Sequence, residues 1–183
     1  MPTTKHVTDL LHEQHAHIQT LFDRVMEAPN RTRRSEAFEE LRRYIAVHET
    51  AEEMITHPVA RGGVDGDAVA GHRLAEEDVI KARLAELDDL DVEDPGFASG
   101  ISQLRVALSQ HMEHEEREEF PLLRTGNDDA QQVRLARAVE AIESVAPTRP
   151  HPTLGSTATS QLMIGPLASV VDRARDAIRK VLG

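Results

Sequence analysis

The sequence contains no cysteine and no tryptophan, and only one tyrosine and four phenylalanines among 183 residues. The absence of cysteine excludes disulfides, thiolate metal ligands and cysteine nucleophiles. No apolar run approaches the ~20 residues that span a bilayer, and the first residues lack the apolar stretch of a signal peptide. We therefore expect a cytoplasmic protein that does not enter a membrane.

Basic residues are also scarce relative to acidic ones. The formal net charge is -11 with histidines neutral. Nucleic acids and anionic membrane surfaces repel such a chain, so we expect neither as a partner. Hydrophobic residues make up 39% of the sequence, enough for the core of one domain, and the ten histidines are an excess for a chain of this size.

Apolar residues recur at steps of three and four along four long segments, a pattern that predicts amphipathic helices. A fifth, shorter helix is expected over residues 128–146, and Ser35 and Ser99 are candidate N-caps. Short connections favour antiparallel neighbours, so residues 1–146 are predicted to form an all-α, up-down-up-down four-helix bundle. The four long helices are expected over 6–27, 35–59, 67–90 and 99–124.

Composition changes after residue 146. Residues 147–163 are rich in proline and predict a linker or an arm on the surface. His151 belongs to this arm unless the arm folds over the bundle as a lid. Residues 164–183 predict a C-terminal amphipathic helix, which would pack on the bundle or form a homodimer.

Histidine and glutamate replace leucine at several positions on the apolar seams. Two segments, HETAEEMITHP at 48–58 and HMEHEEREEFP at 111–121, both read His, three residues, Glu-Glu, four residues, Pro. Counted from the expected helix ends, the polar seam positions fall at roughly one level of the bundle, about 10–17 Å from one end. These positions are His15, His48, Glu52, His72, Glu76, His111 and Glu115.

Buried carboxylates at one level require neutralisation. Each unpaired one costs several kcal/mol, and two or three would rival the stability of a typical domain. No lysine or arginine falls on the predicted seam positions. Metal ions are the simplest solution, with a metal-free bundle of protonated carboxylates as the alternative. The number of ligands suits two ions bridged by Glu52 and Glu115, and nitrogen and oxygen ligands suit iron, manganese or zinc.

These segments resemble the hemerythrin-like family, also called HHE cation-binding domains. The resemblance covers about residues 6–125 and rests on EQHAHIQTLF, HETAEEMITHP, GHRLAEEDV and HMEHEEREEFP. It implies a carboxylate-bridged, non-heme pair of iron ions, in preference to manganese or zinc, that meets dioxygen, peroxide or nitric oxide. By position, the implied metal ligands are His15, His48, Glu52, His72, His111 and Glu115.

The third helix departs from the oxygen-carrying members of that family, because it has His72 and Glu76 where they have His-x3-His. Additional carboxylates stabilise oxidised metals, which favours catalase-like or peroxidase-like chemistry, or sensing in an oxidative or nitrosative stress response, over oxygen carriage. The alternative is a non-catalytic metal-binding protein for iron homeostasis or control of a partner. Candidates for further ligands or their supporting groups are Glu76, Glu49, Glu116 and His12.

Several other polar residues of these segments are expected outside the core. His57 is predicted near a helix end on the face opposite His48. Glu53 and Glu119 are predicted to be solvated, although Glu118 or Glu119 also fits the next seam position after Glu115. Pro58 and Pro121 are predicted to end their helices.

Overall fold

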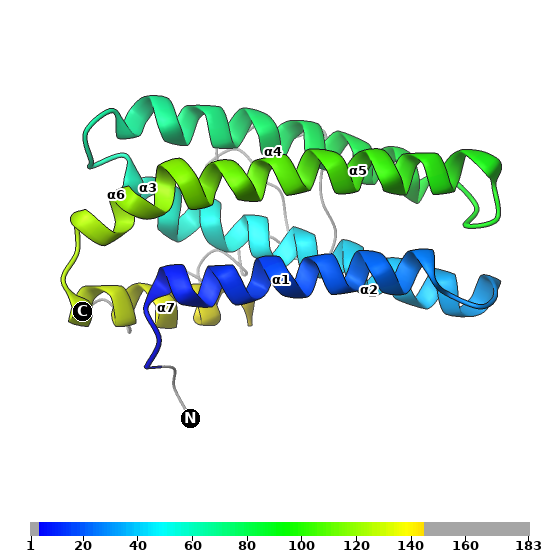
Figure 1. The fold of residues 1–183 in the computed structure, drawn as a ribbon, viewed down its shortest axis with the longest axis horizontal. Coiled ribbons are helices and arrows are strands. Elements are labelled where there is room, and N and C mark those ends of the chain that lie inside the picture. Colours follow the sequence, from blue (N-terminus) through cyan, green and yellow to red (C-terminus); the bar gives the residue numbers. More distant parts are fainter. Residues whose placement is uncertain (1–3, 145–183) are drawn as a thin grey trace, which may run out of the picture.

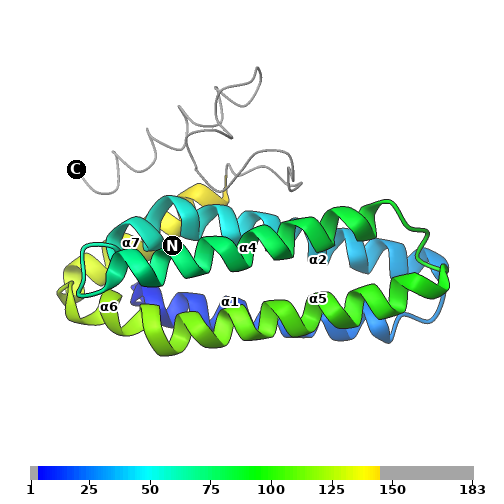
Figure 2. The ribbon, with the colours of Figure 1, turned by 90° about the horizontal axis from the view of Figure 1, so that it is seen from above.

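The computed structural model describes residues 4–144, which form an all-helical bundle (Figure 1). Successive long helices run antiparallel to one another, as the up-down-up-down prediction requires, and residues 4–144 contain no strand. Viewed from above, the long helices lie along a common axis, and a shorter helix lies at one end (Figure 2). The elements are α1 (Val7–Met26), α2 (Arg31–Ala51), η1 (Glu52–Thr56), α3 (His57–Ala60), α4 (Gly66–Asp88), α5 (Pro95–His114), η2 (Glu115–Glu119), α6 (Phe120–Thr125) and α7 (Asp129–Glu143).

The starts of α2, α5 and α7 are capped by asparagine or aspartate, and none of them by the predicted serines. Asn30 caps α2 and Asp94 caps α5, each accepting a hydrogen bond from a backbone N–H of the first turn. Asp128 opens α7 with a reciprocal capping box. The predictions for Ser35 and Ser99 are wrong, because both residues lie inside helices that begin one turn earlier.

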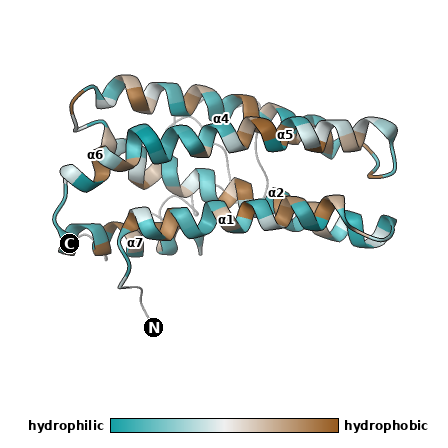
Figure 3. Cartoon of the chain, in the orientation of Figure 1, coloured by the Kyte–Doolittle hydropathy of each residue, from teal (hydrophilic) through white to brown (hydrophobic). Residues whose placement is uncertain are grey.

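The hydrophobic core is divided into two clusters. The larger includes Ile18, Ile45 and Leu108, and the smaller includes Leu11 and residues of α7. Between the clusters the helix interiors are polar, so that α5 changes from hydrophobic to hydrophilic towards α6 (Figure 3). Four buried histidines and six buried glutamates lie in this part of the chain: His15, His48, His57 and His111, with Glu49, Glu52, Glu53, Glu77, Glu115 and Glu119.

Pro58 and Pro121 are accommodated by a local widening of their helices and do not end them. A proline inside a helix lacks the N–H for the usual hydrogen bond, and its ring crowds the carbonyl four residues earlier. Two five-residue π-helical turns, η1 and η2, lie just before Pro58 and Pro121 and accommodate them. In these turns His57 N–H donates to the Glu52 carbonyl, and Phe120 N–H donates to the Glu115 carbonyl. The helical path then continues for one further short helix, α3 or α6.

The predicted fifth helix exists as α7, which packs against α1 and α2 and contributes Leu135, Val139 and Ile142 to the smaller cluster. None of the helices in residues 4–144 combines the length and the apolar character that crossing a bilayer requires. The predicted linker at 147–163, the helix at 164–183 and His151 lie outside the described residues.

Candidate metal centre

Three buried histidines converge from three different helices. His15 comes from α1, His48 from α2 and His111 from α5. The rings of His15 and His48 meet edge to face, with centroids 5.2 Å apart. The Nε2 atom of each of the three is buried and has no hydrogen-bond partner. Three orphaned imidazole nitrogens at one level are the arrangement that a metal ion satisfies.

The other nitrogen of each ring is held by a polar side chain. The Nδ1 atom of His15 lies 2.8 Å from Glu116 Oε1, that of His48 lies 2.9 Å from Gln14 Oε1, and that of His111 lies 3.1 Å from Glu76 Oε2. These groups accept hydrogen bonds, so the neutral form of each ring carries its proton on Nδ1 and its lone pair on Nε2. Metal-bound histidines characteristically have such outer partners. Glu116 and Glu76 thus hydrogen-bond to two of the histidines that the sequence predicts as ligands.

His12, also predicted as a ligand or supporting group, lies at the edge of this arrangement. Its side chain is 44% exposed, and its Nδ1 lies 3.1 Å from Glu116 Oε1. It therefore contacts the carboxylate that holds His15 and lies outside the metal-capable groups of residues 4–144.

Buried carboxylates face the three free Nε2 atoms. Glu115 reaches two histidines with its two oxygens: Oε2 lies 3.4 Å from His15 Nε2, and Oε1 lies 3.2 Å from His111 Nε2. Glu52 Oε2 lies 3.2 Å from His48 Nε2, and Glu49 Oε2 lies 3.5 Å from His111 Nε2. Groups that bind one ion at about 2.0–2.2 Å are separated by distances of this order. A carboxylate with one oxygen on each side can bridge two ions.

The electrostatics of these groups also suit a cation. Burial, and then the neighbouring His15 ring, lowers the pKa of His48 to about 3, so this imidazole is neutral and able to bind metal. Burial raises the pKa of Glu49 to about 7, and burial together with Glu115 raises the pKa of Glu52 well above its ordinary value. Both glutamates carry buried oxygen atoms without a hydrogen-bond partner. Within the bundle, their charged forms lack a sufficient counter-charge.

The predicted seam of α4 is wrong by one residue. His72 and Glu76 were expected inside, but His72 is exposed, Glu76 is half-buried, and Arg73 and Glu77 are buried in their place. His72 therefore does not join the cluster. Ile80 is compatible with either register, because residues three and four positions earlier both lie near its face. The buried position of Arg73 is a further correction, because no lysine or arginine was predicted on a seam.

A second buried ionic network lies beside the three histidines, and the sequence did not reveal it. His57 is 1% exposed, with Nε2 2.6 Å from Glu77 Oε1 and Nδ1 2.9 Å from Glu119 Oε1. Lys81 binds Glu77 at 3.1 Å and also binds Glu53.

The protonation state of His57 follows from its two partners. Although burial opposes a charge, Glu119 and Glu77 raise the pKa of His57 well above its ordinary value. Conversely, although burial opposes its charge, the hydrogen bond and charge of His57, together with Glu53 and Lys81, lower the pKa of Glu77 to about 2. His57 is therefore an imidazolium that donates from both nitrogens. Although burial opposes a charge there too, Glu115 also raises the pKa of His15 and His111, but their Nε2 atoms have no hydrogen-bond partner.

The predictions of an outward His57 and solvated Glu53 and Glu119 are wrong. Glu53 lies one helical turn after the buried Glu49, on the same face, whereas the inward positions of His57 and Glu119 follow from the π-helical turns. Each such turn contains one extra residue, which rotates the following residues by about 100° relative to an uninterrupted helix. The signal in the sequence was the proline that follows, Pro58 in one helix and Pro121 in the other.

Together, the fold and these contacts define a helical-bundle protein with a buried histidine–carboxylate centre able to hold metal ions. Three sets of ligand atoms within residues 4–144 lie close enough to share an ion, each set spanning no more than 4.8 Å. The sets are His15, His48, Glu52 and Glu115; Glu49, Glu52 and His111; and His57, Glu115 and Glu119.

Comparison with known proteins agrees with this class. Residues 6–123 match the model of the hemerythrin HHE cation binding domain, and the chain belongs to that family. An uncharacterised hemerythrin-like protein of Schizosaccharomyces pombe is 20% identical over 176 residues, which cover 95% of this chain and 87% of that protein. The crystal structure of a hemerythrin HHE cation binding domain-containing protein from Mycobacterium kansasii has the same fold. It superposes with a TM-score of 0.69 at 22% identity, over 76% of this chain and 86% of that one.

Proposed function

We propose that this protein holds two iron ions bridged by Glu52 and Glu115 and uses them to bind or react with dioxygen, peroxide or nitric oxide. The observation that carries the proposal is the convergence of three unpartnered histidine nitrogens on unpartnered carboxylate oxygens inside the bundle. The ligands of one ion would be His15, His48, Glu52 and Glu115, and those of the other Glu49, Glu52, His111 and Glu115. Glu49 thus takes a place that the sequence suggested for His72.

The charges inside the bundle support a pair of ions. Six glutamates are buried around the centre. Lys81 and the His57 imidazolium supply two positive charges, which leaves four negative charges when all six carboxylates are ionised. Two divalent ions would balance that remainder, whereas a single ion would leave buried charge uncompensated.

The ligand set favours redox chemistry or sensing over reversible oxygen carriage. Three carboxylates and three imidazoles surround the pair, and carboxylates stabilise oxidised metals. Bound iron would supply one-electron chemistry with dioxygen, peroxide or nitric oxide. The protein's own part is to keep His48 neutral, to fix each ring through its Nδ1 partner, and to hold Glu52 and Glu115 between the two positions. A stress-response role, by peroxide breakdown or by sensing, fits these properties.

The test is metal content followed by reaction. We expect about two irons per chain and visible absorption that changes on addition of peroxide or nitric oxide. Substitution of Glu52→Ala together with Glu115→Ala should abolish both. His72→Ala should retain full metal content, because this histidine is exposed, whereas His111→Ala should not. Stoichiometric zinc with no response to either reagent would refute the redox proposal and favour a non-catalytic metal-binding protein.

A further inference from the structure

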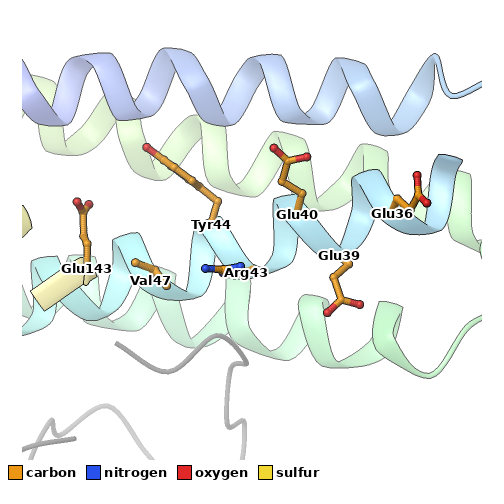
Figure 4. Close-up of a pocket in the computed structure, with 7 residues that line it drawn as sticks. All are labelled: Glu36, Glu39, Glu40, Arg43, Tyr44, Val47 and Glu143. Carbon is orange, nitrogen blue, oxygen red and sulfur yellow. The ribbon is translucent and has the colours of Figure 1, made fainter. Parts of the chain in front are cut away.

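Helix α7 lies beyond the segment that matches the family model, yet it approaches the metal centre. Its last residue is Glu143, and the family match ends at residue 123. Glu143 Oε1 accepts a hydrogen bond of 2.7 Å from Nε2 of Gln14 on α1. The side chain of Glu143 extends from α7 beside Tyr44 and Val47 of α2 (Figure 4). A surface groove of about 480 Å³ gives this carboxylate access to water.

Gln14 connects Glu143 to a proposed metal ligand. Its amide has a donor end and an acceptor end. Because the ionised Glu143 carboxylate accepts only, the NH₂ group of Gln14 faces Glu143 and the oxygen faces His48. The Gln14 Oε1 atom lies 2.9 Å from His48 Nδ1. This orientation requires the proton of the neutral His48 ring on Nδ1.

The proton on Nδ1 decides whether His48 can bind a metal. With Nδ1 protonated, the lone pair of Nε2 points to the buried centre, 3.2 Å from Glu52 Oε2. If the Gln14 amide turned over, its NH₂ group would face His48. The ring would then carry its proton on Nε2, where it blocks the metal.

From this chain of contacts we propose that Glu143, acting through Gln14, is a positioning residue that sets the tautomer of His48. Helix α7 thereby becomes part of the metal centre although it lies beyond the residues that match the family model. The consequence for metal affinity rests on the proposed function, whereas the consequence for the tautomer does not. Loss of outer partners of this kind typically weakens metal binding about 10–100-fold.

The test compares Glu143→Ala with Glu143→Gln. Alanine removes the acceptor, while glutamine can still accept from Gln14 through its amide oxygen. Because Glu143 borders the surface groove, the space left by the alanine substitution is open to water and is not a sealed cavity. Glu140→Ala, one turn earlier on α7, is the matched control, and Gln14→Leu is a second way to break the chain if Glu143→Ala does not fold.

Two readouts are needed. The first is the His48 tautomer in the metal-free protein, from ¹⁵N chemical shifts of the ring. We expect the Nδ1–H form in the wild type, Glu143→Gln and Glu140→Ala, and a shift towards Nε2–H in Glu143→Ala. The second is the affinity for ferrous iron in competition with a chelator, which should weaken about 10–100-fold in Glu143→Ala alone.

The outcomes separate the two proposals. If Glu143→Ala, or Gln14→Leu in its place, keeps the Nδ1–H tautomer of His48, the positioning role is overturned. Unchanged iron affinity in Glu143→Ala overturns it as well. If the wild type binds no iron, the proposed function fails, and the tautomer in the metal-free protein still decides the role of Glu143.

Discussion

His57 provides the most direct test of how this bundle tolerates its buried charge. Its imidazolium lies between Glu77 and Glu119, with donor–acceptor distances of 2.6 and 2.9 Å. Replacing it with alanine removes one positive charge and two charge-assisted hydrogen bonds. After that change, Glu77 keeps Lys81 at 3.1 Å, so most of the loss falls on Glu119.

The expected cost follows from the burial of the partners. Glu77 and Glu119 are 0% and 1% exposed, so water cannot replace the lost partner without a structural change. Removing one member of a buried ion pair typically costs about 3–5 kcal/mol, because the other charge is left uncompensated. We expect His57→Ala to lose free energy of unfolding in that range.

The measurement is denaturant unfolding of the metal-free protein at about pH 6, below the ordinary pKa of histidine. The pKa of His57 is raised in the folded state. Its stabilising contribution is therefore complete at that pH and is lost only as the pH rises through the raised value. His72→Ala is the control, since that histidine is exposed and should change stability by less than about 0.5 kcal/mol.

Two results would contradict this reasoning. One is a loss below about 1 kcal/mol in His57→Ala, which would show that the imidazolium is not the required counter-charge. The other is a loss that appears only after metal is added, which would make His57 a ligand. A second substitution, Glu119→Gln in the His57→Ala background, should restore part of the stability, because it removes the carboxylate left without a partner.

Three further predictions follow from other parts of the structure. Burial raises the pKa of Glu143 from 4.5 to about 7. The stability gained from its protonated form is therefore present below about pH 4.5 and lost as the pH rises to about 7. In thermal unfolding, Glu143→Gln should be more stable than the wild type at about pH 8, by at most about 3 kcal/mol. At about pH 4 the two proteins should be equally stable. Metal at 100 times its Kd should stabilise the wild type by about 2.7 kcal/mol, a shift that a chelator reverses and that Glu52→Ala with Glu115→Ala abolishes. Gly66→Ala would place its Cβ 2.1 Å from a backbone oxygen of α3 and should lower the free energy of unfolding by about 1–3 kcal/mol in denaturant. Gly71→Ala is the control: its Cβ would have nothing within 4 Å, and the free energy of unfolding should rise by about 0.5–1 kcal/mol.

Sequence periodicity was sufficient wherever a helix keeps one regular spacing. His15 lies between Leu11 and Ile18, and both flanking residues are fully buried, as the seam predicted. The same spacing correctly placed His48 and His111 in the core. Regular helices allowed these positions to be counted from the helix ends, because each residue advances the helix by a constant amount.

Periodicity failed where two registers fit equally well or where the helix is not regular. In α4, residues 76 and 77 are both compatible with Ile80, and the sequence alone did not decide between them. In η1 and η2, the extra residue rotates the chain after each π-helical turn, and the inward positions of His57 and Glu119 follow from this rotation. Pro58 and Pro121 follow these turns, but a proline in a helical pattern equally predicts the end of a helix.

The two π-helical turns also explain why the paired motif ends in proline. Each turn begins at a glutamate that we propose as a bridge, Glu52 in one helix and Glu115 in the other. Each turn also brings one further residue inward, His57 from the first and Glu119 from the second, and these two meet at 2.9 Å. Both ring nitrogens of His57 thereby carry protons that are donated to carboxylates. The set of His57, Glu115 and Glu119 therefore has a proton on His57 where a metal ion would bind. The motif therefore places the two carboxylates that we propose as bridges at one level and, by the same turns, supplies an internal cation beside them.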